Sequence, residues 1–200
     1  MDQAKLGRIL TKMEEQGMPQ MIISDPPTIY YLTGKWIHPG ERMLALYLNV
    51  NGNHKLVINK LFPQEKDLGV ELVWYDDVED AVEILSKFVE KDKPIGIDKV
   101  WPARFLLRLQ ELGAGSKFLN GSMIVDYVRM VKDEHEQQLM REASLANDKI
   151  MEELDSACSK GYTENELNAK VREMYAASDS SGVSLILSRA YETSGADPHT

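Results

Sequence analysis

Apolar residues near the start of the chain recur three or four positions apart, as Leu6 and Ile9 show. Side chains with this spacing share one face of a helix, so the pattern predicts an amphipathic helix over residues 2–17. A short apolar run at residues 20–23 predicts a buried strand. The two prolines that follow this run suit the first turn of a short helix ending at Gly34.

The strongest pairing signal in the sequence is a hairpin. Two apolar runs, residues 43–50 and 55–59, flank an Asn-Gly-Asn turn, which favours antiparallel strands. Further apolar patterns predict a strand at 71–75, a helix at 78–89, a strand at 94–98, a helix at 103–112 and strand character over the whole of 116–128. Strands that alternate with helices are typical of a layered α/β domain.

The second part of the sequence has a more helical pattern. Over residues 132–158, apolar side chains recur every three or four positions for about seven turns, which predicts one long helix. Thr163 followed by Glu166 is a capping-box signature, and it predicts another helix through Tyr175. The apolar stretch 183–187 then predicts a buried strand.

This change of pattern divides the chain into two predicted units, residues 1–128 and 129–200. The 200 residues include 43% hydrophobic and 28% charged residues, a balance typical of folded globular proteins. A chain of this length can bury a sizeable apolar core. We therefore expect a folded chain with one full domain and the start of a second.

The charge and the single cysteine narrow the partners and the compartment. A formal net charge of -9 argues against nucleic-acid binding, which needs a basic surface. The first ten residues contain no continuous apolar run, so we expect no signal peptide and no membrane anchor. Cys158 has no second cysteine with which to form an internal disulfide, which fits a reducing compartment. The predicted location is the cytoplasm.

The inventory of reactive residues predicts no self-contained catalytic or metal site. The four histidines, His38, His54, His135 and His199, are far apart, and there is no HExxH pattern or cysteine pair. A GxSxG elbow and a glycine-rich phosphate loop are also missing from the sequence.

Two loops carry more polar and aromatic side chains than a turn requires. Residues 33–42 include Trp36, His38 and Arg42, and this segment is either a binding loop or a Gly/Pro turn with a surface tryptophan. The terminal segment 196–200, Ala-Asp-Pro-His-Thr, is either a binding segment or an ordinary chain end.

These loops and several helix starts carry a family likeness. The sequence resembles the creatinase/prolidase/aminopeptidase P family at Ile-Tyr-Tyr-Leu-Thr-Gly (29–34), Pro-Gly-Glu-Arg (39–42), the helix entry at 127–143, Gly-Tyr-Thr-Glu-Asn-Glu-Leu (161–167) and Ala-Asp-Pro-His (196–199). Each motif alone is weak, but together they follow the family's order across nearly the whole chain.

The resemblance implies a fold for each part. Residues 1–128 would form a creatinase-like N-terminal α/β domain with a mixed β-sheet flanked by helices. Residues 129–200 would form the first helices and strand of an incomplete pita-bread (α+β) metallopeptidase domain.

The resemblance also implies an activity. Family members hydrolyse the bond before proline with two divalent ions, manganese or cobalt, held by two aspartates, one histidine and two glutamates. All five ligands are expected beyond Thr200. We therefore expect the chain to bind no cofactor and to be inactive alone, while the whole enzyme would be an Xaa-Pro dipeptidase or aminopeptidase.

Four residues are candidates for substrate contact through the resemblance. His199 matches the family's substrate-side histidine, which is not a metal ligand. Trp36, His38 and Arg42 lie in the loop that reaches toward the partner subunit in family dimers. The implied partners are a second copy of the chain and a proline-containing dipeptide or short peptide.

Two departures and two rival functions accompany the resemblance. Residues 184–191 lack the family's glycine before the Ala-Asp-Pro-His motif, and Thr200 stands where a second histidine is common. One rival is a non-catalytic pita-bread relative that serves dimerisation or binding. The other is a creatinase-like hydrolase that acts on a different C–N bond.

Overall fold

A computed structural model describes residues 1–64, 67–158, 162 and 164–177 of the chain. Contacts between residues divide the chain into two units, Met1–Val131 and Lys132–Thr200. Each unit is considered by itself below.

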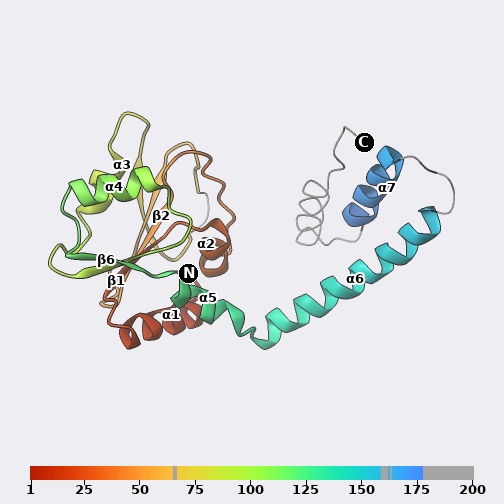
Figure 1. Cartoon of the computed structure of the whole chain (residues 1–200), viewed down its shortest axis with the longest axis horizontal. Coiled ribbons are helices and arrows are strands. Elements are labelled where there is room, and N and C mark those ends of the chain that lie inside the picture. The colour runs from red at the N-terminus through yellow and green to blue at the C-terminus, as the bar shows by residue number, and fades with distance from the viewer. Residues whose placement is uncertain (65–66, 159–161, 163, 178–200) are drawn as a thin grey trace. The chain divides into compact units, whose positions relative to one another are not determined.

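The first unit is built on one β-sheet. Its described strands are β1 (Gln20–Ile23), β2 (Ala45–Asn49), β3 (Lys55–Asn59), β4 (Glu71–Tyr75), β5 (Pro94–Ile97) and β6 (Lys117–Asn120), in the spatial order β4-β3-β2-β1-β5-β6. β2 pairs antiparallel with β1 and β3, whereas β1 with β5, β5 with β6, and β3 with β4 pair parallel. Among these strands only β2 runs against the others. The predicted mixed sheet is confirmed (Figure 1).

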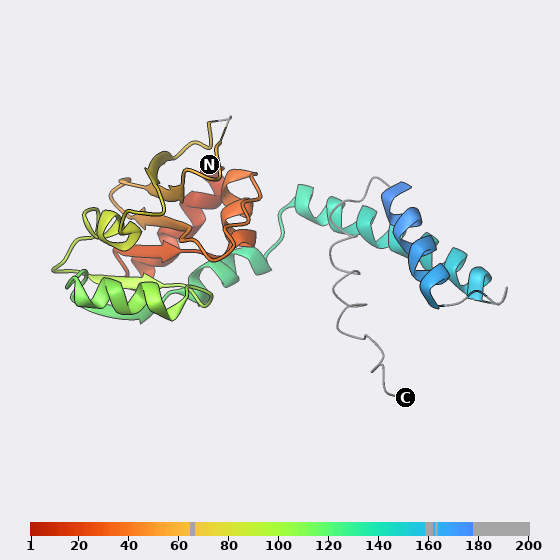
Figure 2. The same ribbon diagram turned by 90° about the horizontal axis from the view of Figure 1, so that it is seen from above.

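Helices cover both faces of this sheet. The described helices of the unit are α1 (Gln3–Glu15), α2 (Pro26–Thr33), α3 (Ala81–Ser86), α4 (Ala103–Glu111) and α5 (Ser122–Met130). Because successive strand side chains point to opposite faces, Met21 and Ile23 of β1 pack with α1, α2 and α5. Ile22 between them packs with α3 and α4. Figures 1 and 2 show α3 and α4 on one side of the sheet and α1 and α5 on the other.

The local signals at the start of the chain produce the elements they predict. Asp25 caps α2 by accepting from the backbone N–H of Thr28 at 3.1 Å, and the prolines occupy the first helical positions. Gly34 ends the helix with φ at 69°, a left-handed conformation that a side chain would strain. The hairpin is also confirmed, with Ala45 opposite Val57.

The prediction of strand character throughout 116–128 is wrong in its second half. β6 ends at Asn120, and the chain then forms α5. The Asn120 side-chain oxygen accepts from the backbone N–H of Ser122 at 3.0 Å, which supports the turn into the helix. Ile124 and Val128 are four positions apart and both are buried, so this stretch has a helical period.

The helix predicted at 78–89 is shorter at both ends. Asp80 accepts from the backbone N–H groups of Val82 and Glu83 at 3.0 and 3.1 Å, so α3 begins at Ala81. Val78 is 94% exposed in the turn that precedes this cap. Residues 87–89 continue as single turns rather than as helix.

The described part of the second unit is a helix pair, α6 (Glu134–Cys158) and α7 (Glu164–Ala177). Asp133 and Glu136 form a reciprocal capping box at the start of α6, with backbone-to-carboxylate distances of 3.0 and 2.9 Å. Ile150, Val171 and Tyr175 form the buried contact between the helices. The predicted long helix is confirmed.

Some predictions concern residues that the structure does not describe, and one concerns the boundary between the two units. Thr163 of the predicted capping box, the strand expected at 183–187 and His199 lie outside the described residues. The expected boundary between residues 128 and 129 falls inside α5, whereas the contacts divide the chain after Val131.

Candidate functional site at the carboxyl edge of the sheet

The carboxyl ends of β1, β3, β4, β5 and β6 lie along one edge of the sheet, because these strands run in the same direction. The start of β2 reaches the same edge, since β2 runs the opposite way. In open α/β sheets this edge is where ligands bind. The loop after α2 leads directly into it.

The loop after α2 presents an aromatic pair to solvent. Trp36 is 46% exposed and Tyr30 is 50% exposed, and their ring centroids are 6.0 Å apart in an edge-to-face arrangement. Ile37 is buried in the core. It anchors the part of the loop that runs from this aromatic pair to β2. His38, the next residue, is exposed.

Arg42 is held in a two-pronged ion pair. Its Nε and Nη2 donate to the two carboxylate oxygens of Asp77 at 2.8 and 2.7 Å. Asn59 donates to the same carboxylate at 2.9 Å. The Arg42 hydrogen bond lowers the pKa of Asp77, and the Asp77 carboxylate in turn raises the pKa of Arg42. Arg42 therefore joins the loop to the carboxyl end of β4.

Beside this pair lies an open pocket of about 480 Å³. It is lined by residues 41–43 before β2, residues 75–77 and 79–82 between β4 and α3, and Arg104, Phe105 and Arg108 on α4. Of the sequence-predicted contact residues that the structure describes, Arg42 alone lines this pocket. Trp36 and His38 are not among its lining residues.

The walls of the pocket are fixed by further polar contacts. Arg108 donates from Nε to Asp80 at 2.8 Å and from Nη1 to Glu111 at 3.1 Å. The Tyr75 hydroxyl donates to the carbonyl oxygen of Met43 at 2.8 Å, and burial raises the pKa of Tyr75. Arg104 donates to the carbonyl oxygen of Glu41. These bonds join the loop, the β4–α3 turn and α4 into one site.

The sequence reasoning missed Asp77, Arg104 and Arg108. Asp77 had one sequence signal, because it lies two residues after the end of the strand predicted at 71–75. No spacing rule links it to Arg42, which is 35 positions away. Arg104 and Arg108 have the appearance of ordinary charges on an amphipathic helix.

The described residues do not fit the paired-metal centre that the resemblance implies. Within residues 1–64, 67–158, 162 and 164–177, no three histidine, cysteine, aspartate or glutamate side chains gather closely enough to hold an ion. Likewise, no helix among these residues is long and apolar enough to span a membrane.

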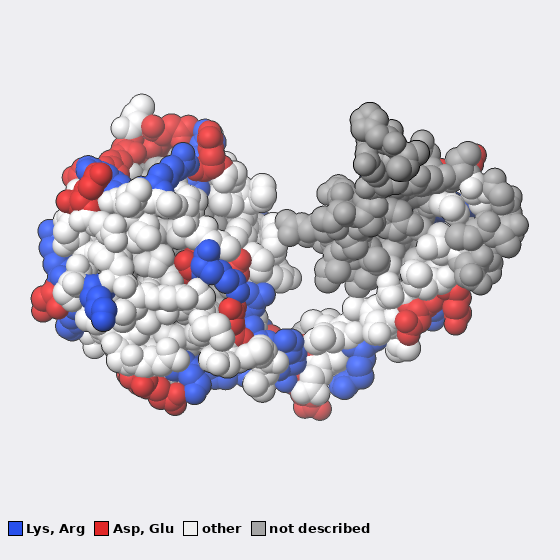
Figure 3. Space-filling view, viewed as in Figure 1, with Lys and Arg blue, Asp and Glu red and all other residues white. Residues whose placement is uncertain are grey.

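The surface of the first unit bears charges of both signs. In the face shown in Figure 3, acidic and basic side chains lie toward the rim of this unit and in one mixed group beside its centre, and uncharged residues fill much of the rest. This distribution shows no continuous basic surface on that face, consistent with the net charge of -9.

Comparison with known proteins supports one family for this fold. The chain is 26% identical over 166 residues to an uncharacterized peptidase of Staphylococcus aureus, an alignment that covers 82% of this chain and 47% of the relative. It spans about half the length of the curated relatives it matches. These relatives are peptidases and hydrolases by name.

Solved structures share the fold. A prolidase from Thermococcus sibiricus superposes with a TM-score of 0.78 at 20% identity, covering 88% of this chain and 50% of the prolidase. The creatinase/prolidase N-terminal domain of an Xaa-Pro dipeptidase from Streptococcus pyogenes superposes with a TM-score of 0.52 at 25% identity, covering 64% of this chain and 98% of that domain. Residues 5–131 match the family described as the creatinase/prolidase N-terminal domain. The chain therefore belongs to the creatinase/prolidase N-terminal domain family.

Proposed function

We propose that this chain serves an Xaa-Pro metallopeptidase of the prolidase type, which hydrolyses the bond before proline in dipeptides or short peptides. The observation that carries the proposal is the match of residues 5–131 to the creatinase/prolidase N-terminal domain. The peptidase names of the relatives support the same class.

In this proposal the loop after α2 contributes contacts to the ends of the substrate. The exposed rings of Trp36 and Tyr30 offer an apolar surface against which a pyrrolidine ring can pack. His38 is free to approach a ligand, because its side chain is exposed. Arg42 offers a guanidinium that Asp77 holds in place. His199 is proposed as a further substrate contact, although it lies outside the described residues.

Metal chemistry would come from donors other than the described residues. Two manganese or cobalt ions would generate a nucleophilic hydroxide and stabilise the charge that develops on the scissile carbonyl. No described group of side chains supplies their ligands. We propose that the 200-residue chain binds neither ion and does not hydrolyse peptides alone.

The direct test is a hydrolysis assay on the purified chain. Glycyl-proline is incubated with the chain and manganese or cobalt, and free proline is measured against a sample with chelator. We expect equal proline in both samples. Metal-dependent release would show that these residues contain a complete catalytic centre, contrary to the proposal.

The rival is a non-catalytic binding module, and the lack of a metal-donor cluster within the described residues fits either function, because the peptidase is proposed to carry its ligands elsewhere. Determining the coding sequence past the codon for Thr200 separates the two. Two aspartates about ten residues apart, followed by a histidine and two glutamates, would support the peptidase. A continuation without these donors would favour the binding module.

The assembly and the compartment are further parts of the proposal. We propose a homodimer in the cytoplasm, with a proline-containing peptide as substrate. Light scattering coupled to gel filtration should give twice the 22.7 kDa mass of one chain. A mass of one chain at micromolar concentration would contradict the dimer.

A further inference from the structure

The pocket beside the Arg42–Asp77 pair holds a guanidinium group with no carboxylate partner. Arg42 and Arg108, which line the same pocket, are each paired with an aspartate. Arg104 instead donates from Nη2 to the main-chain carbonyl oxygen of Glu41. Among the described residues, Arg104 forms no ion pair.

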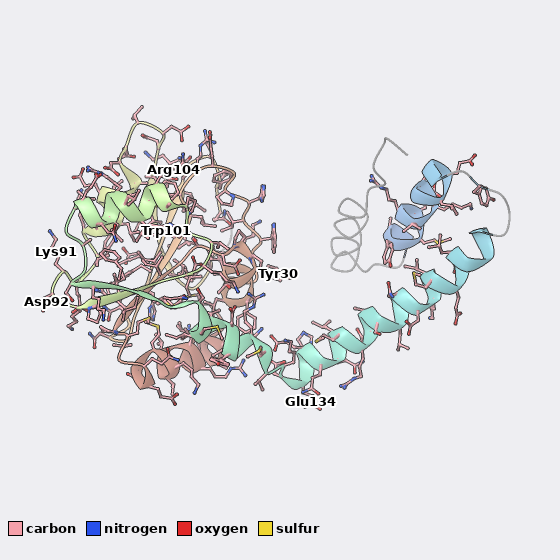
Figure 4. All side chains as sticks on the ribbon, in the orientation of Figure 1. Tyr30, Lys91, Asp92, Trp101, Arg104 and Glu134 are labelled. Carbon is pink, nitrogen blue, oxygen red and sulfur yellow. The ribbon has the colours of Figure 1, made fainter. Side chains whose placement is uncertain are left out.

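Two contacts hold the Arg104 side chain in position. Its Cζ lies over the ring of Phe105, 4.6 Å from the ring centroid, in a cation–π contact. The Glu41 carbonyl takes one of its N–H donors. A guanidinium has five such donors, and the remaining ones are available to a ligand. Figure 4 places Arg104 on α4, with Trp101 just before the helix.

A second unused charge lines the same pocket. The Glu41 side chain is exposed, and its carboxylate makes no hydrogen bond or ion pair with any described residue. Its carbonyl oxygen is the acceptor for Arg104, so the two residues are in direct contact. The Glu41 carboxylate also helps to raise the pKa of its neighbour Arg42, so it interacts with that charge without forming an ion pair. The pocket thus offers a cation and an anion next to each other, neither of which forms an ion pair among the described residues.

The overall charge of the lining argues against a simple anion as the ligand. Three arginines face five acidic side chains, Glu41, Asp76, Asp77, Glu79 and Asp80. Lys60, which is outside the lining, pairs with Asp76 at 3.0 Å and with Glu79 at 3.7 Å, so the acidic excess is one charge. A phosphate or a simple carboxylate would gain the attraction of Arg104 but would be repelled by the acidic excess. A molecule with a carboxylate at one end and an ammonium at the other avoids this repulsion.

We propose that this pocket binds a small zwitterion, a free amino acid or a short peptide, with its carboxylate on Arg104 and its ammonium near Glu41. The volume of about 480 Å³ suits a ligand of this size. A carboxylate on a guanidinium forms a charge-assisted hydrogen bond, which is stronger than a neutral one. This inference is independent of peptide hydrolysis, because it uses only the charges and the pocket.

The test is an NMR titration of the ¹⁵N-labelled chain with glycylglycine, a zwitterion without proline. Ala81 and Val82 are lining residues of the pocket, and the shifts of their backbone amides report on occupancy. We expect saturable shifts at these amides. Arg104→Gln should weaken the apparent affinity about tenfold or more, the loss expected for one charge-assisted hydrogen bond. Arg141→Gln, which changes an exposed arginine of α6, should leave the affinity unchanged.

Blocked probes test the two ends of the ligand separately. N-acetylglycylglycine lacks the ammonium and glycylglycinamide lacks the carboxylate, so each should bind more weakly than glycylglycine. Glu41→Gln should remove the preference for glycylglycine over the acetylated probe. If Arg104→Gln is misfolded by circular dichroism, Arg104→Lys replaces it and should bind with intermediate affinity. No saturable shift at Ala81 and Val82, or equal binding by wild type and both Arg104 variants, would overturn the proposal.

Discussion

Arg129 of α5 donates from Nη1 to the carboxylate of Asp25 at 3.2 Å, which joins two segments 104 positions apart. The same nitrogen also donates to the hydroxyl of Thr28 at 3.1 Å. Asp25 is the cap of α2, and its main-chain N–H donates to Asp98 after β5 at 2.8 Å. Arg129 therefore connects α5 to α2, the helix that leads into the loop containing Trp36, His38 and Arg42.

Removing this contact should destabilise the first unit. Arg129→Met keeps an unbranched apolar side chain but removes the guanidinium, so the half-buried Asp25 loses its cation. We expect a loss of about 1–2 kcal/mol in the free energy of unfolding. Urea unfolding followed by tryptophan fluorescence measures the change, because all three tryptophans of the chain lie in this unit. Lys91→Met is the control, since Lys91 is exposed and has no ion pair among the described residues. If Lys91→Met lost as much stability as Arg129→Met, the prediction would be contradicted.

Gly96 in the middle of β5 is a close-packed position. A methyl group there would overlap the sulfur of Met18 and would lie 3.2 Å from Cγ of Met21. We expect Gly96→Ala to cost about 1–3 kcal/mol of stability through overpacking. Thermal unfolding measures the cost, which should shrink when Met18→Ala is combined with Gly96→Ala.

Gly7 provides the opposite case for comparison. It lies inside α1, and a methyl group there would meet nothing within 4 Å. Gly7→Ala should therefore stabilise the first unit by about 0.5–1 kcal/mol, the helix-propensity difference. A destabilisation similar to that of Gly96→Ala would show that close packing does not explain the effect at Gly96.

A buried amide, Gln20, organises the end of the sheet opposite the candidate site. Its side-chain oxygen accepts from the Tyr47 hydroxyl at 2.8 Å and from the backbone N–H of Glu90 at 2.9 Å, and its nitrogen donates to the carbonyl oxygen of Glu90 at 2.8 Å. Gln20→Leu should cost more stability than Tyr47→Phe, because it leaves several buried polar groups without partners. Hydrogen exchange at the Glu90 amide should become faster in Gln20→Leu. Unchanged exchange in that variant would show that this hydrogen bond does not protect the amide.

The Arg42–Asp77 pair should make stability depend on acidity. The hydrogen bond from Arg42 lowers the pKa of Asp77 in the folded chain, so folding favours the ionised carboxylate. This contribution is fully present above the unfolded pKa of about 3.9 and is lost as the pH falls through the lower folded pKa. Asp77→Asn should therefore lose less stability than wild type between pH 5 and pH 2.5, as measured by urea unfolding.

The partner variant checks the cause of that pH dependence. Arg42→Met removes the hydrogen bond but keeps the carboxylate, so it should flatten the acid dependence to a similar extent as Asp77→Asn. Full acid sensitivity in both variants would contradict the role assigned to the pair.

Much of the secondary structure was predictable because its signals are local. The apolar spacing in α1, the prolines and glycine around α2, and the Asn-Gly turn of the hairpin each act over a few residues. Local signals were ambiguous at residues 116–128, where one apolar stretch contains both a strand and a helix. The sequence also indicated the loop at residues 33–42, because it places an unusual set of side chains between two predicted elements.

The sequence by itself determined the elements and the family likeness, because periodicity, caps and ordered motifs are properties of neighbouring residues. Only the tertiary structure decided that Arg42 pairs with Asp77, that Arg129 contacts Asp25 and that Arg104 lies beside Glu41. These partners are separated by 35, 104 and 63 positions, and no local pattern encodes such distances. Asp25 and Asp77 follow β1 and β4, whose carboxyl ends lie along one edge of the sheet, and residues 41 and 42 precede β2, which starts at that edge. That edge exists only once the strands have paired and the helices have packed on them.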